Sequence, residues 1–176
     1  MASIFGHALA SIAIGSGFSK GLKNIKFWLL GIFCAVFPDA DVLGFKFGIK
    51  YESFFGHRGF SHSIVFALIF GFIVAFLFYR KKKQFLLYAL FFVLATLSHS
   101  VLDAMTTGGL GVAFFSPFDT TRYFFSWRPI KVSPIGVANF FSSWGLQVIK
   151  SELIWIGLPS LGFIILLKLR KFSNIR

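Results

Sequence analysis

Almost all histidines and aspartates of this chain fall into four short clusters, and these are residue types that bind metal ions. The clusters are His7, Pro-Asp-Ala-Asp at 38–41, His-Arg-Gly-Phe-Ser-His-Ser at 57–63 and His-Ser-Val-Leu-Asp at 99–103. Each lies beside an apolar run, where a charged aspartate costs roughly 2.5 to 3.5 kcal/mol at mid-membrane. Because a bound divalent cation neutralises carboxylates, the pattern predicts a metal site built into a membrane protein.

Composition places the chain among integral membrane proteins. Its 176 residues have a mean hydropathy of +0.78 and only 14% are charged, whereas soluble proteins carry about 25% charged residues. Since a helical span needs about 20 residues, the chain has room for one membrane domain, 1–176, and for no second soluble domain. Cys34 is the single cysteine, which excludes an intrachain disulfide.

The net charge of +12 is explained without nucleic-acid binding. Basic residues flank the apolar runs at 20–26, 80–83 and 168–171, and such residues usually mark the cytoplasmic ends of membrane helices. They form no continuous surface, so we expect no nucleic-acid partner.

The expected fold is all-α and polytopic, with about five transmembrane or partly re-entrant helices. These are predicted at 2–18, 27–42, 63–79, 84–104 and 153–169. With the basic groups in the cytoplasm, the N-terminus lies outside, the C-terminus lies inside, and all four clusters reach the outer face. The first segment is not expected to be a cleaved signal peptide, because its positive charges follow the apolar stretch.

The spacing within the clusters suits metal ligands, although each cluster also has a plainer interpretation. His99 and Asp103 are spaced i, i+4 and share a helix face, as two ligands or as a helix-stabilising pair. Pro38 disfavours continued helix, so the carboxylates at 38–41 are expected in an extended turn, as ligands or as helix caps. In the 57–63 cluster, two histidines flank a glycine turn and serines are able to cap the next helix.

Together with Thr-Thr-Gly-Gly at 106–109, Ser-Pro-Phe at 116–118 and Arg122-Tyr123, the clusters resemble the YdjM-like membrane-bound metal-dependent hydrolases. The resemblance covers roughly residues 1–125. It implies a bacterial or archaeal inner-membrane protein with hydrolase activity, distantly similar to zinc-dependent phospholipase C and P1 nuclease. Those enzymes are all-helical and use a cluster of zinc ions.

The resemblance also implies a set of ligands, with one or both aspartates of 38–41 and one or other histidine of 57–63 taking part. The candidates are His7, Asp39, Asp41, His57, His62, His99 and Asp103. The soluble zinc phospholipases have a further histidine and a His-xxx-Glu pair, and no histidine follows His99 here. We therefore expect one or two divalent ions, with zinc the favoured metal.

A metal at such a site supports hydrolysis of a phosphate ester by activated water. Asp39 or Asp41 is the expected general base or bridging carboxylate. Arg58 is the expected catalytic partner, and Arg58 and Arg122 are candidates for holding substrate phosphate, unless they bind lipid headgroups instead.

The loop at 105–150 is rich in aromatic residues, which favour the headgroup level of a membrane. It would admit a lipid or lipid-linked substrate, or serve only as an interfacial anchor. Two function classes follow: a membrane-embedded metal hydrolase, and a non-catalytic metal-binding protein or ion transporter. A transporter usually places its ligands near the midplane, so ligands at helix ends favour the enzyme.

Overall fold

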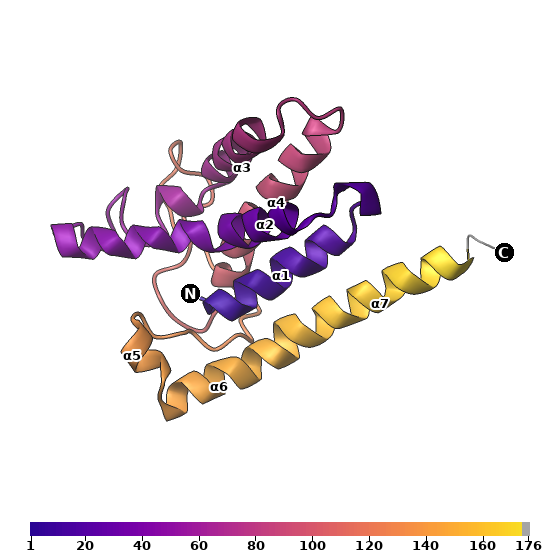
Figure 1. The fold of residues 1–176 in the computed structure, drawn as a ribbon. Coiled ribbons are helices and arrows are strands. Elements are labelled where there is room, and N and C mark those ends of the chain that lie inside the picture. The colour runs from indigo at the N-terminus through magenta and orange to yellow at the C-terminus, as the bar shows by residue number, and fades with distance from the viewer. Residues whose placement is uncertain (174–176) are drawn as a thin grey trace.

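The computed structural model describes residues 1–173, apart from the side chains of residues 20, 137, 138 and 171–173. Helices account for all its regular elements, and the described residues form two isolated β-bridges but no strand. In chain order (Figure 1) the elements are α1 Ile4–Ser16, η1 Lys20–Leu22, α2 Ile25–Val36, η2 Phe37–Phe47, η3 Phe60–His62, α3 Ile64–Tyr79, α4 Phe85–Ala104, α5 Val137–Phe140, α6 Ser143–Glu152, η4 Leu153–Gly157 and α7 Leu158–Ser173.

Three helical segments are long and apolar enough to cross a membrane: Ile25–Phe47, Phe85–Ala104 and Ser143–Arg170. Two shorter apolar helices, Ile4–Ser16 and Ile64–Tyr79, accompany them. Each of these five segments overlaps one of the five that the apolar runs predict, and the all-α fold is confirmed.

The core forms where α4 packs against α1, α2 and α3. Gly71 of α3 lets that helix approach α4, since a Cβ atom there would lie 2.4 Å from the backbone nitrogen of Val93. Gly31 of α2 similarly accommodates the buried ring of Phe91. Small residues at such crossings are typical of membrane helices, where close packing replaces the hydrophobic effect.

The last helix begins ten residues earlier than its apolar run suggests, so part of the predicted 105–150 loop is helical. Ser142 caps α6, its hydroxyl accepting from the N–H of Gly145 at 3.4 Å. The first turns of α6 are polar, which hides them from an argument based on hydropathy alone. The rest of the loop is irregular and is held by bridges between Thr106 and Ile130 and between Val112 and Tyr123.

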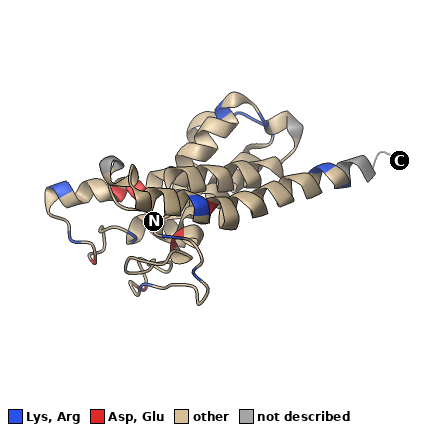
Figure 2. Cartoon of the chain, turned by 90° about the horizontal axis from the view of Figure 1, so that it is seen from below, with Lys and Arg blue, Asp and Glu red and all other residues tan. Residues whose placement is uncertain are grey.

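The connections between α1 and α2 and between α3 and α4, which carry basic residues, lie at one end of the bundle together with the C-terminal end of α7 (Figure 1). The N-terminus lies away from this end. Lys and Arg are visible at that end, on the far end of η2 and in the irregular loops near the N-terminus, while Asp and Glu lie away from the basic end (Figure 2). This arrangement agrees with the predicted threading. Which end faces the cytoplasm stays a prediction from the positive-inside rule.

Candidate metal centre

The last turns of α4 carry His99 and Asp103, both fully buried on one face of the helix. Nδ1 of His99 lies 2.7 Å from the carbonyl oxygen of Ala35 in α2. Because a carbonyl only accepts, Nδ1 carries the hydrogen and Nε2 keeps its lone pair. A backbone carbonyl that fixes the ring in this way is the usual support of a metal-binding histidine.

The chain stays helical through Pro38, so the extended turn predicted at 38–41 is wrong. Pro38 lies in the first turn of the 3-10 helix η2, where the missing N–H is tolerated. With three residues per turn, Asp39 and Asp41 project about 120° apart around the axis. The two carboxylates consequently face different partners.

Asp41 faces the loop that precedes α3, and its oxygens are occupied there. It lies 2.7 Å from Nδ1 of His57 and accepts from the Ser61 hydroxyl at 2.6 Å and from a backbone N–H of the same loop at 3.1 Å. Nδ1 of His62 is 3.2 Å from Oδ2 of Asp41. These contacts orient the ring of His62 so that its Nε2 faces His99.

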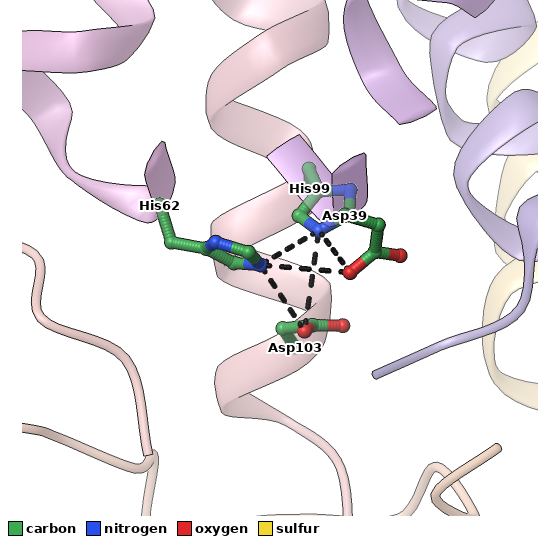
Figure 3. A group of neighbouring side chains, drawn as sticks. All are labelled: Asp39, His62, His99 and Asp103. Atoms are coloured by element: carbon green, nitrogen blue, oxygen red, sulfur yellow. Dashed lines mark hydrogen bonds and ion pairs between the residues drawn. The ribbon is translucent and has the colours of Figure 1, made fainter. Parts of the chain in front are cut away.

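Asp39, His62, His99 and Asp103 come together as a buried group (Figure 3). The two Nε2 atoms are 3.0 Å apart, and Oδ1 of Asp39 is 3.4 Å from His99 and 3.7 Å from His62. Oδ2 of Asp103 is 3.6 Å from His62 and 4.0 Å from His99. Since ligand atoms around a tetrahedral zinc ion lie about 3.3 Å apart, this group could bind a metal ion with little adjustment.

Several buried polar atoms at this point have no hydrogen-bond partner within the described part of the chain. They include both carboxylate oxygens of Asp39 and both ring nitrogens of His7. The ring of His7 stacks on His99 at 3.8 Å, and its Nε2 lies 3.5 Å from Asp103 and 3.9 Å from Asp39. Leaving a buried polar group unpaired costs about 1 to 3 kcal/mol, more when it is charged, so this donor set fits a cation.

The carboxylates around His62 favour the protonated form of its ring. Burial alone would lower the pKa of His62, but the neighbouring carboxylates of Asp103, Asp39 and Asp41 favour the protonated imidazole and raise the pKa to about 10. When protonated, Nε2 of His62 would donate to the lone pair of His99 across their 3.0 Å contact. Burial is also the main reason that the pKa of His57 is lowered.

Arg58 lies beneath the group, fully buried, with a left-handed φ of 63°. Its Nε is 3.0 Å from Asp103, while Nη1 and Nη2 donate to the carbonyl oxygen of Gly108 at 2.8 Å and to the hydroxyl of Thr106 at 2.9 Å. A Cβ atom at Gly109 would lie 2.6 Å from Nη1, which explains the glycine. Arg58 thus supports Asp103, and its catalytic and phosphate-binding roles stay predictions.

Arg122 holds two loops together at the rim of the site. It donates to the carbonyl oxygen of His57 at 2.7 Å and to that of Tyr51 at 2.9 Å, and it packs over the Tyr51 ring. Its predicted contact with substrate phosphate also stays untested.

Cationic groups already lie beside the carboxylates of the group. Asp39, Asp41 and Asp103 carry three negative charges, while Arg58 pairs with Asp103 at 3.0 Å and the N-terminal ammonium lies 4.0 Å from Asp103. The negative charge that remains favours a divalent cation at this point.

The group lies within the bundle, toward one end of α4. His99 is fourteen residues from the first residue of α4, or about 21 Å at 1.5 Å per residue, compared with about 30 Å for the hydrocarbon core of a bilayer. The group therefore lies nearer to the C-terminal end of α4 than to its basic end.

Glu152, which is absent from the predicted site residues, is a carboxylate that is only 3% exposed although it lies at the start of an apolar run. An acidic residue at such a position is itself a signal of function in a membrane protein. Its side chain accepts from the backbone N–H and the hydroxyl of Ser3.

Comparison with known proteins is consistent with this description. The chain is 41% identical over 162 residues to the inner membrane protein YbcI of Escherichia coli, covering 92% of this chain and 94% of that protein. No solved structure matches. The family described as YdjM inner membrane protein matches residues 1–174, so the chain belongs to the YdjM family.

Proposed function

We propose that this protein is a membrane-embedded, metal-dependent hydrolase that cleaves a phosphate ester of a lipid or lipid-linked substrate. Asp39, His62 and His99 would hold one divalent ion, with zinc the favoured metal. The observation that carries the proposal is the buried carboxylate of Asp39, which faces two imidazoles and has no hydrogen-bond partner among the described residues. When bound, the ion would polarise a phosphoryl oxygen and lower the pKa of a coordinated water.

The role of Asp103 separates a catalytic centre from a structural one. Catalytic zinc sites use three protein ligands and keep one position open, whereas structural sites are closed by four. Asp103 is farther than Asp39 from Nε2 of His99, at 4.0 Å against 3.4 Å, and about as far from Nε2 of His62, and its Oδ2 is already paired with Arg58 at 3.0 Å. We infer that Asp103 stays outside the ligand set and accepts the proton of the attacking water, a role expected from the sequence for Asp39 or Asp41.

The proposal leaves His7, Asp41 and His57 in supporting roles. Asp41 orients His62, and His57 in turn contacts Asp41 at 2.7 Å. His7 packs on His99 and contacts Asp103, where it would fix the carboxylate.

A lipid substrate is supported by an apolar groove between α1, α4 and the last helix. It has a volume of about 560 Å³. Ala13, Leu94 and Phe163 contribute to its lining, as does Ala10, which is one helical turn from His7 on α1. In a bilayer this groove would be at hydrocarbon depth, so an acyl chain suits it.

Metal analysis tests the first half of the proposal. Purified protein should contain about one equivalent of zinc or another divalent ion, and His99→Ala and Asp39→Asn should lose it. Asp119→Asn is a matched control, because Asp119 is partly exposed and its two hydrogen bonds are with Thr121 and Tyr123 of its own loop. A folded wild-type protein that binds no divalent ion would refute the centre.

Activity measurements test the second half, against a non-catalytic metal-binding protein or an ion transporter. The nearly complete burial of all four residues of the group favours that alternative, because it restricts access. The metal-loaded protein should hydrolyse a phosphomonoester or phosphodiester in a panel of lipids, and Asp103→Asn should keep the metal but lose activity. Loss of metal in Asp103→Asn, with no hydrolysis by the wild type, would favour a structural site.

A further inference from the structure

Glu152 is a buried carboxylate that lies outside the group of four. It is the last residue of α6 and is followed at once by η4, a five-residue π-helical segment. Wide turns of this kind are rare and often occur at functional sites. A carboxylate in an apolar helix needs a partner, and Glu152 finds one in the segment that leads into α1.

Both oxygens of Glu152 are used by a single residue. Oε1 accepts from the backbone N–H of Ser3 and Oε2 from its hydroxyl, each at 2.5 Å. The same hydroxyl caps α1, accepting from the N–H of Gly6 at 3.4 Å. Glu152 therefore fixes the start of α1.

The fixed segment is in direct contact with the candidate metal centre at two points. The N–H of Ala2 donates to Oδ1 of Asp103 at 2.7 Å. The N–H of His7 donates to the carbonyl oxygen of Ser3 at 3.1 Å, which places the His7 ring one turn along α1. A displacement of Ser3 would consequently move the partners of both Asp103 and His99.

The start of α1 packs closely against the last helix, which leaves little space for either helix to move. A Cβ atom on Gly6 would lie 2.9 Å from Cδ1 of Ile156 and 3.0 Å from the carboxyl carbon of Glu152. The helices meet at van der Waals distance, so the two hydrogen bonds to Ser3 are formed in a tightly packed interface.

We propose that Glu152 is a positioning residue, which sets the geometry of the metal centre through Ser3 without touching the ion. The inference rests on the proposed metal centre. Supporting groups of this kind typically change metal affinity 10- to 100-fold when they are removed.

The experiment compares cobalt-loaded wild type with Glu152→Ala, Glu152→Gln and Ser3→Ala. The visible absorption of bound Co²⁺ reports ligand geometry, and competition with a chelator reports affinity. Glu152→Ala should shift the cobalt spectrum and weaken binding about 10- to 100-fold. Glu152→Gln should cause a smaller change in the spectrum and in affinity, because its amide oxygen still accepts a hydrogen bond from Ser3. The Ser3→Ala and Glu152→Ala effects should be less than additive, since both variants remove the hydrogen bond between the Ser3 hydroxyl and Oε2 of Glu152.

Glu52→Ala is the matched control, because Glu52 is an exposed carboxylate, and it should leave both readouts unchanged. An unchanged spectrum and affinity in Glu152→Ala would overturn the positioning role alone; Glu152→Gln serves as the test variant if the alanine variant does not fold. A wild-type protein that binds no Co²⁺ or Zn²⁺ would overturn the proposed centre, and the positioning role with it.

Discussion

At the scale of single residues, Asp39 and Asp41 have different roles in the site although they are close in sequence. Among the described residues, the carboxylate of Asp39 has no hydrogen-bond partner and faces the imidazoles. The carboxylate of Asp41 instead forms hydrogen bonds with His57 and Ser61 of the loop before α3. We expect Asp39→Asn to abolish metal binding. Asp41→Asn should weaken it about 10- to 100-fold, because only the orientation of His62 is disturbed. Equal losses in the two variants, measured by chelator competition, would contradict this division.

The proton on His62 makes metal binding depend on pH. With a pKa raised to about 10, His62 is protonated at neutral pH in the metal-free site, and an ion must displace that proton. Apparent affinity should therefore rise about tenfold per pH unit between pH 6.5 and 8. Stability that the proton gives to the metal-free protein should be complete below about pH 6.5 and be lost as pH rises toward 10. Affinity that does not vary with pH would contradict a protonated His62.

At the scale of elements, the crossing of α3 and α4 sets the distance between His62 and His99. Gly71→Ala would place a methyl group 2.4 Å from the backbone of Val93. The helices would have to separate, at a cost of about 1 to 3 kcal/mol. Gly162→Ala on α7 is the matched control, since nothing lies within 4 Å of its added Cβ atom. It should be neutral or stabilising by up to about 1 kcal/mol. Thermal unfolding in detergent would measure both, and equal midpoints would argue against a close crossing.

At the scale of the whole molecule, the sequence predicts the apolar segments and the convergence of the four clusters, because hydropathy and basic flanks carry that information. It does not predict which carboxylate faces the centre. That depends on the change of α2 into a 3-10 helix at Phe37, which alters the angle between Asp39 and Asp41. It also misses the polar start of α6 and the partner of Glu152, because a contact between α1 and α6 leaves no periodic pattern in the sequence.

The orientation of the molecule in the membrane is a separate prediction, and labelling tests it. The positive-inside rule places the α3–α4 turn in the cytoplasm and the loop before α3 on the outer face. In a Cys34→Ser background, Ser53→Cys should react with an impermeant maleimide from the outer side of the inner membrane. Lys82→Cys, in the basic turn, should react only in inverted vesicles. The reverse labelling would place the metal centre nearer the cytoplasmic face, where its substrate would have to be a lipid of the inner leaflet.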